Sequence, residues 1–157
     1  MNHEAFLRRA IELALESDPA TGDTPFGTVI VKDGRIVGEG RNRVATSHDP
    51  TAHSEVEAIR DACRRLGTHS LEGCVMYTSG EPCPMCAGAI VWAKLSRIYY
   101  GASRADCIAL GLASEDVVNE VNKPIEERSI PAERLCAEET NEALRGWVAR
   151  AKSVSSG

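Results

Sequence analysis

Two short segments of the chain carry side chains that could bind a metal ion and move protons. They are His53-Ser54-Glu55 and Pro82-Cys83-Pro84-Met85-Cys86. Cys83 and Cys86 are three residues apart, so their thiols share one face of a helix's first turn, where the helix dipole favours thiolates. Two thiolates and the His53 imidazole supply three zinc ligands, and zinc sites with three protein ligands keep a fourth position for water. The segments therefore predict one catalytic zinc ion per chain.

Glu55 is the predicted proton carrier of this site. It lies two residues after His53, so the two side chains would diverge around the axis of a helix that ends at the metal. Glu55 could then face the open position and hold the water instead of binding the metal. From there it would take a proton from the water and deliver it to the substrate.

Each segment has an ordinary alternative when it stands alone. A lone Cys-x-x-Cys is typical of a redox pair or of half a structural zinc site, and a lone His-x-Glu is typical of a helix start. Together, at the starts of two helices and next to prolines, they favour the catalytic zinc site. The sequence has no second Cys-x-x-Cys and no His-x-x-x-His that would close a structural site.

The rest of the pattern predicts alternating strands and helices that would position these segments. Helices are expected over residues 3–16, from Asp49-Pro50-Thr51 to Gly67, over 85–94 and 105–112, and after a cap at Thr140. Strands are expected over 26–31, 35–40, 74–78, 97–101 and 134–137, with a hairpin turn at Lys32-Asp33-Gly34. This alternation predicts a three-layer α/β/α fold with helices on both faces of one sheet.

Two of these helices carry apolar residues that are expected to be buried. The segment 85–94 has no charged residue before Lys94, which is typical of a helix buried on nearly all sides. The last helix is expected to bury Leu144, Trp147 and Val148.

Length and composition bound the class of protein. A chain of 157 residues predicts one domain over residues 1–157. No window approaches about 20 consecutive apolar residues, so no membrane span is expected. The start, Met1-Asn2-His3-Glu4, lacks the pattern of a signal peptide, and we expect a cytoplasmic protein.

The charge balance argues against a polymeric nucleic-acid partner. The net charge is −5, and residues 115–142 hold nine acidic side chains against three basic ones. Binding a long phosphate backbone requires clustered lysine and arginine, so that class is disfavoured, whereas a small nucleobase ligand is not.

The chain resembles the cytidine deaminase superfamily and, within it, the small bacterial guanine deaminases. His-x-Glu followed by Pro-Cys-x-x-Cys is the zinc motif of that superfamily. The other segments that carry the resemblance are Pro25-Phe26-Gly27, Asn42, Asp49-Pro50-Thr51-Ala52, Tyr77-Thr78-Ser79-Gly80-Glu81, Gly88-Ala89-Ile90 and Lys123-Pro124.

The resemblance implies a fold, an assembly and a set of site residues. It implies a central mixed sheet of five strands and a homodimer in which the segment 124–157 can be exchanged between subunits. It implies zinc on His53, Cys83 and Cys86, with Glu55 as the proton shuttle. The implied substrate-binding residues are Asn42, Phe26, Ala52 and Trp92. Asn42 could instead simply end its strand, and Phe26 and Trp92 could instead be core residues.

The loop of Ser114, Glu115 and Asp116 departs from the resemblance. The guanine deaminases carry an acidic residue where Ser114 aligns, and that residue assists with the purine. Either Glu115 or Asp116 replaces it, or the preferred substrate is different.

The expected activity is the zinc-dependent hydrolytic deamination of a nucleobase or nucleoside, with a purine such as guanine as the leading substrate and ammonia as a product. The alternatives are another amino-heterocycle such as cytosine or guanosine, or the adenosine of a tRNA. A zinc-stabilised interaction module without catalysis is a third reading, against which Glu55 and the open ligand position argue.

Overall fold

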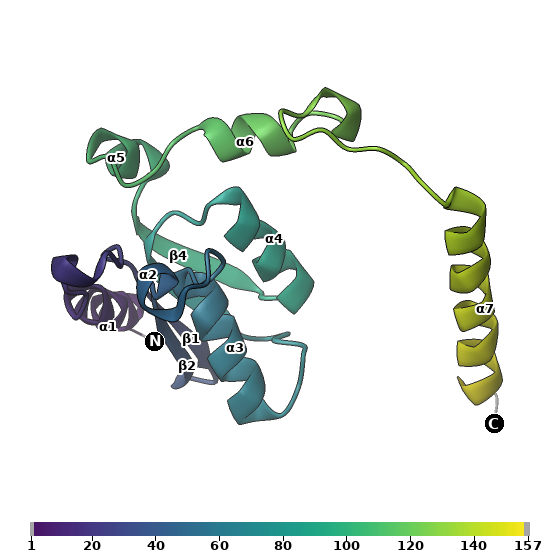
Figure 1. The fold of residues 1–157 in the computed structure, drawn as a ribbon. Helices are drawn as coiled ribbons and strands as arrows, with labels where there is room; N and C mark the ends of the chain where they lie inside the picture. Colours follow the sequence, from purple (N-terminus) through teal and green to yellow (C-terminus); the bar gives the residue numbers. More distant parts are fainter. Residues whose placement is uncertain (1, 156–157) are drawn as a thin grey trace. The chain divides into compact units, whose positions relative to one another are not determined.

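The structure is a computed structural model that describes residues 2–155 of the chain (Figure 1). Within this range, residues up to Asn119 form one compact unit and residues from Glu120 onward form a second. Across residues 2–155, no helix combines the length and the apolar character that a membrane crossing requires.

The centre of the first unit is a mixed sheet with the strand order β2-β1-β3-β4. β1 pairs antiparallel with β2 and with β3, whereas β3 pairs parallel with β4. The β1–β2 hairpin turns at Asp33 and Gly34, which both have positive φ, as the sequence predicts. The strands are β1 (Gly27–Lys32), β2 (Arg35–Arg41), β3 (Val75–Gly80) and β4 (Arg97–Ala102).

Among the described residues the sheet has four strands, so the prediction of a fifth strand over 134–137 is wrong. Extended backbone is interrupted there, because Cys136 has a φ of 52°. The next residue, Ala137, already begins the last helix, α7 (Ala137–Ser155).

Helices cover both faces of the sheet, which confirms the three-layer arrangement (Figure 1). On one face, α1 (His3–Leu15) packs its Leu13 against Val29, Val31 and Tyr77. On the other face, α3 (Ser54–Leu66) and α4 (Pro84–Ala93) close a core that includes Ile30, Met76 and Ile90. The two faces of β1 and β3 are therefore buried under different helices.

α3 packs directly against β2 at two glycines of the strand. A Cβ atom built on Gly40 would lie 2.6 Å from the Ser54 carbonyl oxygen, and one on Gly38 would lie 2.7 Å from the Ala58 carbonyl oxygen. Only glycine allows the helix backbone to come this close to the strand. The start of α3 is consequently fixed by direct contact with β2.

The sequence misplaces the start of α3. It predicts that Asp49-Pro50-Thr51 opens this helix, whereas the helix begins at Ser54 with His53 as its N-cap. The Asp49 carboxylate instead accepts hydrogen bonds from the backbone N–H and the hydroxyl of Thr51, at 2.8 and 2.6 Å. Asp49 therefore closes a turn before the helix and does not cap it.

Several short helices complete the chain. Two of them, α2 (Val44–Ser47) and α6 (Asp116–Val121), were not expected from the sequence. The others are α5 (Arg104–Ala109) and the 3₁₀ turns η1 (Pro19–Thr21) and η2 (Ile125–Glu127).

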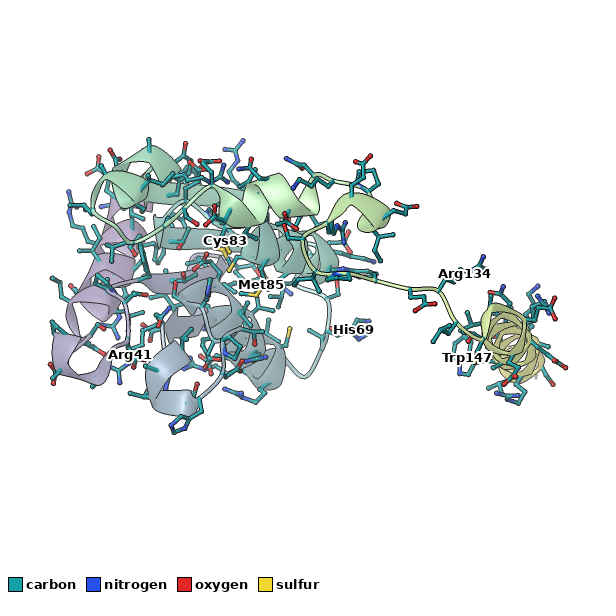
Figure 2. All side chains as sticks on the ribbon, turned by 45° about the horizontal axis from the view of Figure 1, so that its top comes forward. Arg41, His69, Cys83, Met85, Arg134 and Trp147 are labelled. Atoms are coloured by element: carbon teal, nitrogen blue, oxygen red, sulfur yellow. The ribbon has the colours of Figure 1, made fainter. Side chains whose placement is uncertain are left out.

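The expected burial of two apolar helices is wrong in this chain. On α4, Val91 and Trp92 are 77% and 87% exposed, because only one side of the helix faces the core. On α7, Leu144, Trp147 and Val148 are all exposed. Figure 2 shows side chains standing out all round α7, with Trp147 labelled. An apolar sequence predicts that a surface is buried, but it does not show whether the same chain or a partner buries it.

Candidate metal centre and active site

The two predicted chemical segments start two helices with the same local geometry. His53 is the N-cap of α3 and Cys83 is the N-cap of α4, both with extended backbone, and neither side chain caps its own helix. Pro84 follows Cys83 at the first helical position, where its missing N–H costs no hydrogen bond. Figure 2 labels Cys83 and Met85 near the start of α4. Both N-cap side chains are thus available for the metal.

His53, Cys83 and Cys86 place their ligand atoms together, all within 4.8 Å of one another. The His53 Nδ1 atom lies 3.6 Å from the Cys83 Sγ atom and 3.5 Å from the Cys86 Sγ atom. Tetrahedral zinc with ordinary Zn–N and Zn–S bond lengths requires an N···S separation of about 3.6 Å. The donor set and its spacing therefore fit one zinc ion.

The two thiols differ in how readily they ionise. The pKa of Cys83 is lowered to about 4, first by the hydrogen bond from Cys86 and then by the His53 imidazole. The pKa of Cys86 is raised, because this thiol donates to Cys83, is buried, and lies beside Glu55. Zinc binds thiolates, so loading the site would release the proton that Cys86 holds.

Glu55 lies in the first turn of α3, 6% exposed, beside the metal ligands. Its Oε1 atom accepts a hydrogen bond of 2.6 Å from the Ser54 hydroxyl. Burial raises the pKa of this carboxyl above its usual range, against the opposing effect of the Ser54 hydrogen bond. A carboxylate that accepts a proton more readily than usual is suited to carry one between water and a substrate.

A pocket of about 330 Å³ opens onto this centre, a volume near the lower end for small-ligand sites. Its lining brings together six of the predicted site residues, all from the first unit. They are Phe26, Asn42, His53, Glu55, Cys83 and Ser114.

Five predicted residues do not line this pocket, and one of them is the metal ligand Cys86, which is fully buried. Ala52 is buried, and its carbonyl accepts a 2.9 Å hydrogen bond from the Arg43 backbone N–H. Trp92 stands exposed near the end of α4, eight residues beyond the first helical position. Glu115 and Asp116 are exposed beside the pocket wall. Ala52 and Trp92 therefore do not line the pocket of the single chain, and their contact with the substrate stays a prediction.

Asn42 presents only part of its amide to the pocket. Its Oδ1 atom accepts hydrogen bonds from the backbone N–H groups of Thr24 and Val44, at 3.4 and 3.2 Å. These two donors use both lone pairs of the oxygen, which leaves the NH₂ group to face a ligand. Asn42 can therefore donate to an acceptor on a substrate, whereas its amide oxygen is already used by the backbone.

Three pocket residues with reactive or charged side chains were missed by the sequence analysis. Glu81 and Arg104 form an ion pair of 3.2 Å, and the Glu81 carboxylate also accepts from the Arg104 backbone N–H at 3.1 Å. Cys107 is 6% exposed, and burial raises the pKa of its thiol. Glu81 directly precedes the cysteine motif, which was the available signal. Arg104 and Cys107 lie outside both chemical segments, and only the three-dimensional structure shows that they line the pocket.

The arrangement as a whole is suited to hydrolysis of a small ring compound. Bound zinc would supply Lewis acidity, which makes water a stronger acid near neutral pH. Glu55 would take the proton of that water and return it to the substrate, while the pocket walls hold the ring and exclude bulk water. An α/β sheet that presents this donor set and carboxylate at two helix starts defines a zinc-dependent hydrolytic deaminase.

Comparison with known proteins gives the family. The family model for the cytidine and deoxycytidylate deaminase zinc-binding region matches residues 1–102. The chain belongs to this family of deaminases.

Relatives of known activity and structure share much of the chain. Guanine deaminase of Bacillus subtilis (strain 168) is 49% identical over 94% of both sequences. A solved guanine deaminase from Bacillus subtilis covers 95% of both chains with a TM-score of 0.89 and 48% identity. The tRNA-specific adenosine deaminase of Aquifex aeolicus (strain VF5) is 42% identical over 65% of this chain and 67% of that protein. A solved protein in complex with 2,6-diaminopurine is 30% identical, with a TM-score of 0.66 over 71% of this chain and 62% of that one.

Proposed function

We propose that this enzyme hydrolyses the exocyclic amine of a free purine base, with guanine as the leading substrate, to give the keto base and ammonia. The observation that carries the proposal is the spacing of His53, Cys83 and Cys86 for one zinc ion with Glu55 beside them. The 49% identity to a guanine deaminase over nearly the whole chain supports the choice of base.

The contacts expected for the base follow from the pocket lining. Phe26 supplies an aromatic wall for a planar ring, and the NH₂ group of Asn42 donates to a ring nitrogen or carbonyl. Guanine offers acceptors of both kinds. Glu55 exchanges protons with the ring nitrogen next to the carbon that loses its amine.

The part of the pocket lined by Ser114 leaves the choice between guanine and other bases open. Ser114 lines the pocket, whereas Glu115 and Asp116 do not, so this loop presents a hydroxyl and no carboxylate. The Asp116 carboxylate accepts a hydrogen bond of 3.3 Å from the Ser114 hydroxyl. Guanosine, cytosine and other amino-heterocycles therefore remain alternatives to be tested directly.

The decisive experiment measures ammonia release by the purified zinc-loaded protein. The panel contains guanine, guanosine, adenine, cytosine and 2,6-diaminopurine, together with a tRNA substrate scored for adenosine editing. We expect the highest kcat/KM on guanine and none on tRNA. Ammonia release from none of the small compounds would overturn the proposed activity, and editing of tRNA would favour the adenosine deaminase alternative.

A homodimer is also part of the proposal. It is supported by the exposed apolar residues Val91 and Trp92 on α4 and Leu144, Trp147 and Val148 on α7, since a second copy would cover both surfaces. Lys123-Pro124 and Ile130-Pro131 interrupt regular structure and would serve as the hinge for exchange of the segment 124–157. The single deaminase domain over 1–157 and the cytoplasmic location stay predictions.

A further inference from the structure

A row of buried hydroxyl groups leads from the sheet to Glu55. The Ser54 hydroxyl lies 2.6 Å from the Glu55 carboxylate, and the Thr28 hydroxyl lies 2.9 Å from the Ser54 hydroxyl. The hydroxyls of Thr28 and Thr78 lie a further 2.9 Å apart. Ser54, Thr28 and Thr78 are all 0% exposed, so water does not compete for these hydrogen bonds.

The row depends on the register of the sheet. Thr28 on β1 lies directly opposite Thr78 on β3, and two residues further along the same face Ile30 lies opposite Met76. That face is therefore apolar beneath the body of α3 and polar beneath its first turn, where Glu55 is placed. Burying three hydroxyls in an otherwise apolar core costs free energy that their hydrogen bonds to one another and to Glu55 must offset. Apolar side chains would pack there without that cost, so packing alone does not explain the hydroxyls.

Counting hydrogens gives the row a direction. The Glu55 carboxylate only accepts, so the Ser54 hydroxyl must donate to it and can only accept from Thr28. The Thr28 hydroxyl then donates to Ser54 and accepts from Thr78. Each hydroxyl donates once, and among the described residues no buried side-chain nitrogen or oxygen lacks a partner. Hydrogen bonds aligned in one direction polarise and strengthen one another.

We propose that Ser54, supported by Thr28 and Thr78, is a positioning residue that holds the Glu55 carboxylate in one orientation. This rests on the proposed role of Glu55 as the proton carrier. The Cys86 thiol also hydrogen-bonds to this carboxylate, but a thiolate bound to zinc would no longer donate to it. With Oε1 held by Ser54, an oxygen of Glu55 would then be left to exchange protons with water and with the substrate. A carboxylate fixed before the reaction does not have to reorient during it, which favours turnover more than substrate binding.

A purely structural role would place these hydrogen bonds elsewhere. Ser54 is the first residue of α3, where a serine hydroxyl ordinarily bonds to nearby backbone groups. Here the hydroxyl bonds to the side chain of the next residue, Glu55. The matched case is Ser79, which follows Thr78 on β3 and whose hydroxyl accepts a hydrogen bond of 3.1 Å from the Gly27 backbone N–H and not from a hydroxyl of the row.

The experiment compares four variants with the wild type on the base that the wild type deaminates fastest. Ser54→Ala removes the donor to Glu55, and kcat should fall by about 10- to 100-fold with KM within twofold. Thr28→Val keeps the shape but removes the second hydroxyl, and kcat should fall by about 3- to 10-fold. Thr28→Ser restores the hydroxyl and should recover most of that loss. Ser79→Ala should lower thermal stability and leave kcat within twofold.

A second readout does not depend on the identity of the substrate. Zinc content should stay at one per chain in all four variants, and crystal structures should show one Glu55 rotamer in the wild type but a rotated carboxylate in Ser54→Ala. The failure of guanine as a substrate would leave these structures unchanged. The inference is overturned if Ser54→Ala keeps the wild-type Glu55 rotamer or loses zinc. It is equally overturned if its kcat stays within twofold, or if Thr28→Ser behaves like Thr28→Val.

Discussion

The two compact units of the chain use their apolar residues in opposite ways. The unit of residues 2–119 buries two clusters, one on each face of the sheet, and places every pocket residue between its own elements. In residues 120–155 no described residue is buried. Large apolar side chains are exposed there instead: Ile130 is 81% and Leu135 is 71% exposed, and Trp147 on α7 is exposed as well. The first unit therefore contains all the residues that line the pocket. The second exposes large apolar side chains that a partner would cover under the proposed dimer.

Removing a metal ligand is the strongest way to test that the chemistry is confined to the first unit. Cys83→Ala and Cys86→Ala each leave two protein ligands, so we expect loss of stoichiometric zinc and of all measurable turnover. Metal analysis of the purified proteins checks this, with Cys136→Ala, an exposed cysteine of the second unit, as the matched control. Full zinc content in either ligand variant would disprove the assignment.

The next largest effect is expected at Glu55. Glu55→Gln keeps the shape of the side chain but cannot carry a proton, so turnover should fall by at least about 10²–10⁴-fold while zinc content and melting temperature stay close to wild type. Steady-state kinetics and metal analysis on the same preparation separate the two effects. A loss of turnover below tenfold would assign the proton transfer to another group.

The second unit is tested by its assembly. Leu144→Glu with Trp147→Glu places two charges on the apolar side of α7 and should weaken the dimer by about 100-fold or more, since burial of each side chain contributes about 1.5–3 kcal/mol. Glu142→Lys, on the opposite side of the helix, is the control. Analytical ultracentrifugation measures the dissociation constant. A wild type that sediments as a monomer at micromolar concentration would remove the dimer from the proposal.

The pocket wall at Ser114 should change the choice of base more than the rate of proton transfer. Ser114→Asp brings a carboxylate to the lining and should shift the ratio of kcat/KM between guanine and cytosine by about tenfold or more. Glu115→Gln and Asp116→Asn should shift it less, because neither residue lines the pocket. Kinetics of all three variants on the panel of bases decide the point. Equal ratios throughout would show that the loop does not select the base.

The smallest expected effect is a local pH response in the second unit. The pKa of Glu120 is lowered from 4.5 to about 2, first by the Ser129 hydroxyl, then by the Ser129 N–H and by Lys123. A lowered pKa contributes stability that is present above pH 4.5 and is lost as the pH falls through about 2. The amide resonance of Ser129 should therefore shift over that range in an NMR titration. Glu120→Gln should abolish the shift.

The sequence predicted best those features that neighbouring residues determine. Pro84 identified the start of α4, the Asp33-Gly34 turn identified the hairpin, and the spacing of Cys83 and Cys86 identified the metal centre. Asp49 was misleading because the same side chain suits a turn and a helix cap, and only the surrounding chain decides between them.

The features that escaped prediction depend on residues far apart in the chain. The contact of Thr28 with Ser54 spans 26 residues and requires the register of the sheet to be known. Arg104 reaches the pocket through its pairing with Glu81 across 23 residues. The exposure of Trp92 could not be predicted from the apolar sequence of its helix. The same apolar residue types occur on helix surfaces that pack in their own core and on surfaces that pack against a partner.

The close contact of Gly40 with α3 has a consequence for mutational scanning of this enzyme. Any larger side chain at Gly40 must push against the carbonyl of Ser54, and so displace the turn that carries both His53 and Glu55. Gly40 lines no part of the pocket, yet its substitution should score as damaging as loss of a zinc ligand. A functional map drawn from activity alone would therefore assign this strand glycine to the active site, and only a parallel measurement of protein abundance would separate the two.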